Sequence, residues 1–168
     1  NGIQSPDTSI WIGKDKRRIK ENSLIKPIFG SQGKGIKLVK KNTNINKLEV
    51  SGNVFYLQRF LDRINQLMYS DFRVLVSNHR VIASMKRESK DFLTNVFQGA
   101  SYSKIELNEN VLKLAEKVSK IFKLGYGGID IKINNNKVFV LEVNSIPSWK
   151  NIDKLYSIDL TEKLVNDF

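Results

Sequence analysis

The chain has 168 residues, 40% of them hydrophobic, and a formal net charge of +11 from 28 lysines and arginines against 17 aspartates and glutamates. This size predicts a domain with a real core, and the absence of cysteine excludes disulfides and thiolate metal sites. No run approaches 18 apolar residues and no segment reads as a signal peptide, so we expect a soluble, cytoplasmic protein without a membrane partner. The positive charge favours an anionic partner such as a nucleotide, an acidic peptide or nucleic acid.

The first third of the chain predicts short strands with little helix. Strands are expected at residues 9–12, 24–27, 36–40 and 54–58, a brief basic helix capped by Asp15 is expected to run through Glu21, and a short helical segment is expected near 45–50. Because the sequence begins at Asn1 and not at methionine, we expect a piece of a longer protein.

A glycine-rich turn from Gly30 to Gly35 joins two of these strands. Its bare backbone N–H groups can approach a phosphate closely. It is not a Walker A loop, because too few residues separate Gly30 from the Gly33-Lys34 pair and no Ser or Thr follows. A plain tight turn is the alternative, and Lys26 on the preceding strand is either a phosphate contact or a solvated lysine.

The middle of the chain predicts a hairpin from residues 71–77 and 80–89, with His79 as a surface residue in its turn. Arg73 and Arg87 fall at alternate positions that could face one cleft, where a guanidinium suits bidentate recognition of phosphate or carboxylate. Solvated strand arginines are the alternative.

Two helices are expected after this hairpin. Asn108 should cap an amphipathic helix that ends near Phe122 and buries the stripe Val111, Ala115, Val118 and Phe122. A second helix is expected at residues 159–167, packing Leu160, Leu164 and Val165.

A third hairpin is predicted from the apolar runs 128–133 and 137–144. Directly opposite residues share a face of a sheet, and a three-residue loop at 135–137 gives one wholly apolar face. That register pairs Ile133 with Phe139, Ile131 with Leu141 and Ile129 with Val143. A two-residue loop would mix the two faces and lose burial at each pair.

The other face of the third hairpin carries Asp130 opposite Glu142, with Asn144 two residues further along. Two opposed carboxylates repel each other unless a positive charge lies between them. Oxygen ligands from Asp, Glu and Asn suit a hard ion such as Mg²⁺. The alternative is an acidic surface pair on an ordinary hairpin.

Four motifs in this order resemble the ATP-grasp enzymes, in particular the RimK-like glutamate ligases. GIDIKI followed by LEVNSIPSW resembles their metal-binding end, and Lys-Pro-Ile-Phe-Gly-Ser-Gln-Gly resembles their Lys-x-x-x-Gly-Ser/Thr-Gln-Gly motif. By this resemblance Asp130, Glu142 and Asn144 hold two Mg²⁺ ions, with Mn²⁺ as an alternative, against the phosphates of ATP. Lys26 then contacts phosphate under the glycine-rich loop.

The resemblance extends to a hinge strand, whose backbone hydrogen-bonds adenine, and to an Asp-x-Arg motif on the middle hairpin. The residues that it places at the nucleotide are Lys26, Gly30, Ser31, Gln32, Gly33, Gln58, Arg59, Phe60, Asp71 and Asn95. It gives catalytic roles to Arg73, Arg87 and Lys26, which meet phosphate or substrate oxygens.

The sequence departs from the family at three positions. Arg59 replaces a glutamate of the hinge, which puts a ribose contact in question. Leu93 and Gln98 stand where the RimK-like ligases usually have arginine, so two cations are absent from the expected substrate pocket.

The resemblance implies an α+β fold of the ATP-grasp class, with two antiparallel lobes clasping the nucleotide, residues 1–61 as the small lobe and 62–168 as the large lobe with the metal site. The family's amino-terminal domain would precede Asn1. The implied activity is an ATP-dependent carboxylate–amine ligase that forms an amide bond through an acylphosphate. Its amine would be glutamate or another amino acid, and its acceptor a small molecule or a protein carboxyl terminus. A fragment that depends on the absent domain and a basic nucleic-acid-binding module are the alternatives.

Overall fold

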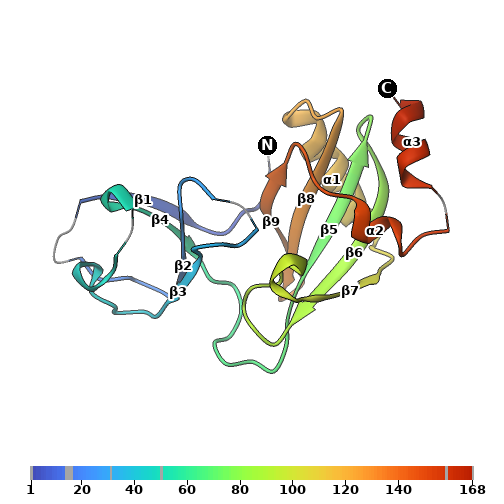
Figure 1. Cartoon of the computed structure of the whole chain (residues 1–168). Coiled ribbons are helices and arrows are strands. Elements are labelled where there is room, and N and C mark those ends of the chain that lie inside the picture. Colours follow the sequence, from blue (N-terminus) through green and yellow to red (C-terminus); the bar gives the residue numbers. More distant parts are fainter. Residues whose placement is uncertain (1, 14–16, 31, 50, 158, 168) are drawn as a thin grey trace. The chain divides into compact units, whose positions relative to one another are not determined.

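The computed structural model describes residues 2–13, 17–30, 32–49, 51–157 and 159–167. It divides into two compact units, which we call the small unit, Pro6–Gln66, and the large unit, Asn1–Ser5 with Leu67–Phe168. Each unit is built on its own antiparallel sheet (Figure 1). Among the described residues, no helix combines the length and the apolar composition needed to cross a membrane.

The small unit is a four-stranded sheet with its core on one face. The strand order is β1 (Thr8–Ile12), β4 (Val54–Arg59), β2 (Ser23–Lys26) and β3 (Lys37–Val39). Phe55 and Leu57 of β4 and Ile25 of β2 are buried with Ile19 and Ile45, which come from the connections. The helical segment expected near 45–50 is a pair of 3₁₀ turns, Ile45–Lys47 and Ser51–Asn53.

The basic helix expected before β2 is wrong over the described part of its range. Asp15 lies outside the described residues, and Arg18 forms an isolated bridge with Asn44. Ile19 donates its backbone N–H to the Thr43 carbonyl at 3.0 Å and accepts a hydrogen bond from Asn42 N–H at 2.7 Å. Burying Ile19 against this distant segment outweighs the local propensity of a run of like charges.

The large unit is a five-stranded sheet covered by helices on both faces. The strand order is β7 (Ser101–Lys104), β6 (Arg80–Ser89), β5 (Tyr69–Ser77), β8 (Tyr126–Asn134) and β9 (Lys137–Asn144). Figure 1 shows α1 (Glu109–Ile121) on one side of this sheet and α2 (Lys150–Asp153) and α3 (Leu160–Asp167) on the other. β7 and α2 were not predicted, because neither has an apolar period of its own.

The α1 side of the sheet holds the larger core. Val111, Ala115 and Val118 are buried against β5 and β8, and Asn108 caps the helix by accepting a hydrogen bond from Val111 N–H at 3.0 Å. Phe122, expected in the same stripe, is 59% exposed, because the helix ends at Ile121. Lys123, with a φ of 53°, turns the chain away there.

His79 is more than a surface turn residue. It is half-buried, and its Nδ1 lies 2.8 Å from the hydroxyl of Ser119, which is fully buried on α1 and donates to the Leu124 carbonyl at 3.1 Å. The contact ties the β5–β6 turn to the carboxyl end of α1, and nothing in the sequence pattern indicated it.

The β8–β9 hairpin keeps Asp130 opposite Glu142, but several β9 residues lie on another face than predicted. Val138 and Val140 face Ile133 and Ile131 in place of Phe139 and Leu141, and Phe139 lies opposite Lys132. Its loop has two residues, Asn135 and Asn136, whose φ angles of 48° and 61° suit a tight hairpin turn, so the three-residue loop is wrong. Ile131 therefore faces Val140 and not Leu141, and a β-bulge at Leu141 then restores the register. Beyond the bulge Asp130 lies opposite Glu142, as predicted.

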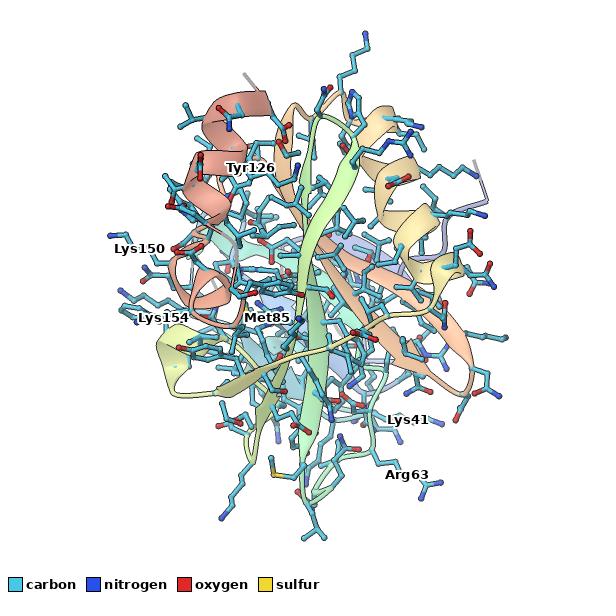
Figure 2. The ribbon with its side chains drawn as sticks, turned by 90° about the vertical axis from the view of Figure 1, so that its right-hand side faces the viewer. Lys41, Arg63, Met85, Tyr126, Lys150 and Lys154 are labelled. Atoms are coloured by element: carbon cyan, nitrogen blue, oxygen red, sulfur yellow. The ribbon has the colours of Figure 1, made fainter. Side chains whose placement is uncertain are left out.

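The chain after β9 crosses the large sheet before it forms α2. A Cβ added to Gly128 would lie 2.8 Å from Pro147 Cβ, so only glycine at this position lets the crossing segment pack so closely on β8. Beyond the crossing, Ile152 and Leu160 bury themselves against Leu75, Ala83 and Met85. Figure 2 shows Lys150 and Lys154 on the outer side of α2, away from Met85 of β6.

Candidate functional site

Four charged side chains form one network on the α2 side of the large sheet. Arg73 donates to both carboxylate oxygens of Asp130, from Nε to Oδ1 and from Nη2 to Oδ2, each at 2.8 Å. Arg87 donates to both oxygens of Asp71 at 2.6 Å, and its Nη2 also lies 3.0 Å from Asp130 Oδ2. The strands set these contacts, because Arg73 is directly opposite Asp130 and Arg87 is directly opposite Asp71.

The network is buried, and burial and neighbouring charges shift the pKa of three of its members. The side chains of Arg87, Asp130 and Asp71 are 3%, 7% and 9% exposed, whereas that of Arg73 is 17% exposed. Burial alone would raise the pKa of the Asp130 carboxyl, but Arg87 and Arg73 outweigh it and hold that pKa below its ordinary value. Burial opposes the charge of Arg87 as well, but Asp130 and Asp71 raise the pKa of the guanidinium. Burial raises the pKa of the Asp71 carboxyl, and Arg87 and Thr94 offset only part of that rise. Asp130 and Arg87 therefore stay charged at neutral pH.

The sequence analysis did not predict two polar side chains that lie near this network. Thr94 Oγ1 donates to Asp71 Oδ2 at 2.7 Å. Lys132, buried on β8, donates from Nζ to the Ser70 carbonyl at 2.6 Å. Alternation along β8 places Lys132 on the Asp130 face, so a lysine two residues after a candidate ligand was the available signal.

The three residues expected at the metal share the network's face of the sheet but differ in their surroundings. Glu142 is exposed opposite Asp130, and Asn144 lies opposite Gly128. The Asn144 Nδ2 is buried without a hydrogen-bond partner. Among the described residues no group of three or more His, Cys, Asp or Glu side chains forms a metal cluster, because the third oxygen here belongs to an amide.

The side chains of Asp130, Glu142 and Asn144 carry the oxygen ligands that a hard divalent cation requires. Carboxylate and amide oxygens are the ligands that Mg²⁺ takes in proteins. The orphaned amide of Asn144 is consistent with it, since turning the amide over would present an oxygen at the same place. The positive charge that the sequence argument required beside Asp130 is supplied in this structure by Arg73 and Arg87.

The glycine-rich turn of the small unit folds back on the end of β2. A Cβ on Gly30 would lie 2.9 Å from Pro27 Cγ, and Gly33 and Gly35 adopt φ angles of 72° and 78°. Gln32 is also in the left-handed region, with a φ of 59°, and Ser31 lies outside the described residues. The turn therefore needs its glycines for backbone reasons, whether or not it meets a phosphate.

Lys26 and Gln58 lie on the same face of the small sheet. Lys26 is paired with Tyr56, and Gln58 follows two residues later on β4, where it is buried opposite Leu24. This is the face opposite the small unit's core, and it carries Ile10 and Ile12, which are 58% and 76% exposed. An exposed apolar surface with Lys26 at its end can bind a ligand in which a flat ring is joined to an anionic group.

The hinge residues after β4 are held within the small unit. Arg59 N–H donates to the Asp7 carbonyl and Phe60 N–H to the Asn22 carbonyl, both at 2.8 Å. The Arg59 side chain lies 3.0 Å from Glu21 and 3.6 Å from Asp7. These two N–H groups are therefore already bonded within the unit.

The segment after β6 has mainly local contacts. Asn95 caps the 3₁₀ turn Val96–Gln98 by accepting a hydrogen bond from Phe97 N–H at 2.8 Å. Leu93 is half-buried and Gln98 is exposed. Thr94 reaches the charged network through its hydrogen bond to Asp71.

Comparison with known proteins identifies the family. The family model of the RimK-like ATP-grasp domain matches residues 3–168. The chain is 34% identical over 164 residues to the tetrahydromethanopterin:alpha-L-glutamate ligase of Methanocaldococcus jannaschii, covering 93% of this chain and 54% of that protein. It is 31% identical over 153 residues to the ligase of the same name in Methanococcus maripaludis, covering 88% and 52%.

Solved structures agree at the level of the fold. The D-alanine–D-alanine ligase of Bacillus anthracis superposes with a TM-score of 0.71 at 15% identity, covering 99% of this chain and 60% of that chain. The ATP-grasp ligase PsnB, in a complex with a precursor variant, Mg and ADP, superposes with a TM-score of 0.67 at 17% identity, covering 99% and 53%. The chain spans about half the length of the curated relatives it matches. Its two antiparallel sheets are the ATP-grasp fold, and the chain belongs to the RimK-like ATP-grasp domain family.

Proposed function

We propose that this chain is the nucleotide-binding and catalytic part of an ATP-dependent carboxylate–amine ligase. The observation that carries the proposal is the oxygen set Asp130, Glu142 and Asn144, which the β8–β9 register and bulge bring to one face beside Arg73 and Arg87. Family membership supports it, because the relatives matched along most of this chain are named glutamate ligases.

The proposed reaction has two steps. A carboxylate oxygen of the acceptor attacks the γ-phosphorus of ATP, and the bond to ADP breaks. The amine nitrogen then attacks the carbonyl carbon of the acylphosphate, phosphate leaves, and the nitrogen loses a proton to give the amide. The transferred phosphoryl group carries spread negative charge, so fixed cations around it lower the barrier.

In the large unit we propose that Asp130, Glu142 and Asn144 hold Mg²⁺, with two ions as the expected number and Mn²⁺ as a substitute. The metal would neutralise charge on the phosphate oxygens and orient them. Arg73, the most exposed member of the network, would meet phosphate or substrate oxygens. Arg87 is held by both Asp71 and Asp130, so we propose that it fixes their positions.

In the small unit we propose that Lys26 and the turn Gly30 to Gly35 bind the phosphates. The open face with Tyr56 and Gln58 would take the adenine, and Arg59 and Phe60 belong to the same hinge. For Asp71 and Asn95 the contacts favour a supporting role, because Asp71 is saturated by Arg87 and Thr94 and Asn95 caps a turn.

The substrates are proposed by class. The relatives' names give glutamate as the amine, and both relatives named above are tetrahydromethanopterin:alpha-L-glutamate ligases. A peptide or protein acceptor is the alternative class, since PsnB was solved in complex with a precursor peptide. Leu93 and Gln98 bring no cation for a second carboxylate, so we infer that an amine with fewer carboxylates than glutamate competes well with it.

The first prediction tests the metal set. Asp130→Asn and Glu142→Gln should each lower metal-dependent ADP release by about a hundredfold or more, since either change removes a charged ligand. ADP release is measured with a panel of carboxylates and with glutamate or neutral amino acids as amines, and circular dichroism checks the fold.

The matched control is Glu88→Gln, which removes a half-buried carboxylate from β6 that pairs with Lys86 at 2.7 Å. It should leave ADP release within about twofold of the wild type. Undiminished ADP release from the Asp130→Asn/Glu142→Gln double variant would show that the metal set is assigned to the wrong residues. Failure of the wild-type chain to bind Mg-ATP would contradict the proposed function itself.

A further inference from the structure

The two arginines beside Asp130 are held very differently. The Arg87 side chain is 3% exposed, and it contacts two carboxylates, with hydrogen bonds to both oxygens of Asp71 and an ion pair with Asp130. Arg73 is 17% exposed, and its guanidinium hydrogen-bonds to one carboxylate, that of Asp130. If one arginine is to leave Asp130, the contacts single out Arg73.

The carboxylate of Asp130 has no spare oxygen while Arg73 is bound to it. Oδ1 accepts from Arg73 Nε, and Oδ2 accepts from Arg73 Nη2 and Arg87 Nη2. Glu142 stands opposite and exposed, with the orphaned amide of Asn144 next along the same face. Glu142 is thus accessible and the side-chain amide of Asn144 has an unsatisfied nitrogen, whereas both oxygens of Asp130 are engaged by guanidinium groups.

Electrostatic repulsion also favours the departure of one arginine. A dication added beside Asp130 would face the guanidinium groups of Arg73 and Arg87 at short range. Moving Arg73 off Asp130 removes one of those charges and frees an oxygen in the same motion. The guanidinium then needs an anion elsewhere, and a phosphate oxygen suits its fork.

We propose that Arg73 is a resident counter-ion of Asp130, which occupies the metal position in the metal-free chain and gives way when a divalent cation and its nucleotide bind. The inference rests on the proposed role of Asp130 as a metal ligand. It adds that Arg73 suppresses binding of Mg²⁺ alone, so that the chain takes up the metal with the nucleotide that gives Arg73 a new partner.

The test compares the wild type with Arg73→Leu in the presence of Mg²⁺ alone or Mn²⁺ alone, with no nucleotide. Mn²⁺ binding is followed by electron paramagnetic resonance, and the effect of Mg²⁺ on stability by urea unfolding with and without EDTA. Wild-type chain should bind the free ion weakly. Arg73→Leu should bind it about tenfold more tightly or better, because no guanidinium competes for Asp130.

The matched control is Arg80→Leu. It removes an arginine of the same unit from an exposed ion pair, in which Nη1 lies 3.7 Å from Glu116. Its Mn²⁺ affinity should equal that of the wild type. Adding Asp130→Asn to Arg73→Leu should abolish the gain.

Arg73→Leu leaves a buried carboxylate short of a partner, so it could be unfolded in EDTA. In that case refolding on addition of Mg²⁺, but not of Na⁺ at equal ionic strength, supports the proposal. Arg73→Lys, which keeps the charge but not the two-atom fork, should lie between the wild type and Arg73→Leu in Mn²⁺ affinity.

Equal Mn²⁺ affinity in the wild type and Arg73→Leu would overturn the counter-ion role, as would a gain that survives Asp130→Asn. These results are distinguishable from failure of the proposed function. That failure would appear as absence of Mg-ATP binding by the wild type, whatever Arg73 does.

Discussion

At the scale of single residues, Tyr126 joins the start of β8 to the segment that crosses it. Its hydroxyl donates to the Pro147 carbonyl at 2.9 Å, and its ring meets that of Trp149 edge-on at 6.1 Å. Burial raises the pKa of Tyr126 to about 12, and Arg73 lowers it by less. The phenol is therefore kept neutral in the folded chain, where it serves as a donor.

This gives a pH-dependent prediction for Tyr126→Phe. The folded chain holds the Tyr126 proton more tightly than the unfolded chain, so its contribution to stability is complete below about pH 10. It is lost as the pH rises from about 10 to about 12. At neutral pH Tyr126→Phe should cost about 0.5–1.5 kcal/mol for the lost hydrogen bond. The difference in unfolding free energy between the two proteins should shrink across that alkaline window.

Urea unfolding at several pH values measures this difference, and near-ultraviolet absorbance follows tyrosinate formation in the folded chain. Tyr102→Phe, which removes a half-buried phenol from β7, is the control. A difference between wild type and Tyr126→Phe that stays constant through the window would contradict the raised pKa.

The sequence predicted which residues belong to the candidate site better than it predicted the contacts among them. Glu142 and Asn144 share a face by period-two alternation, and the requirement for one apolar face placed Asp130 opposite Glu142, although the assumed loop length was wrong. That Arg73 meets Asp130, and that Arg87 meets Asp71, depends on the pairing of β5 with β8 and β6, which no local pattern specifies. Thr94 was missed for the same reason, because its partner is 23 residues away.

At the scale of elements, the β8–β9 hairpin shows where a register argument succeeds and fails. The requirement for one apolar face was correct for Ile129 and Ile131 of β8, but Val140 and not the predicted Leu141 completes that face. An odd number of residues lies between Asp130 and Glu142, and the extra one can sit in the loop or in a bulge. Two asparagines favour the tight turn, so the chain placed the extra residue at Leu141. The apolar face of β8 was therefore predictable, whereas the loop length and the β9 residues between the loop and the bulge were not.

Packing of the crossing segment on β8 can be tested with two neighbouring glycines. At Gly128 an added Cβ meets the Pro147 ring, with contacts of 2.8 Å and 3.2 Å, and Pro147 is buried and fixed by its ring. At Gly127 the nearest atom is the tip of the Leu124 side chain at 2.7 Å, which can rotate away. Gly128→Ala should therefore cost about 1–3 kcal/mol of stability, and Gly127→Ala less.

Urea unfolding of both variants gives the comparison. Gly128→Ala should also weaken Mg-ADP binding, because Asn144 lies directly opposite Gly128. Equal costs for the two variants would show that Pro147 yields as readily as Leu124, and that the crossing segment is not held rigidly on β8.

At the scale of the whole chain, the net charge of +11 is spread over both units and does not form a binding site by itself. Lysines lie on the exposed side of α1, on the outer side of α2 and along the small unit. A field of this kind raises the encounter rate with any anion, whereas specific contacts set how long the anion stays. The charge is therefore consistent with a Mg-ATP ligand and with the nucleic-acid alternative, and kinetics can separate them.

The last prediction uses this separation. Lys120 and Lys123 lie exposed at the end of α1, on the face of the large sheet opposite the charged network. Lys120→Gln/Lys123→Gln should lower the association rate of Mg-ATP by less than about twofold at low salt and leave its dissociation rate unchanged. Lys26→Ala should instead raise the dissociation rate of Mg-ATP while leaving that of adenosine nearly unchanged, because its proposed partner is a phosphate. Stopped-flow kinetics with a fluorescent ATP analogue at several salt concentrations measures both rates.

Equal effects of the two changes on dissociation would mean that lysines act only through net charge. Displacement of Mg-ATP by DNA, with a slope against salt that falls by about one for each lysine removed, would favour the nucleic-acid alternative.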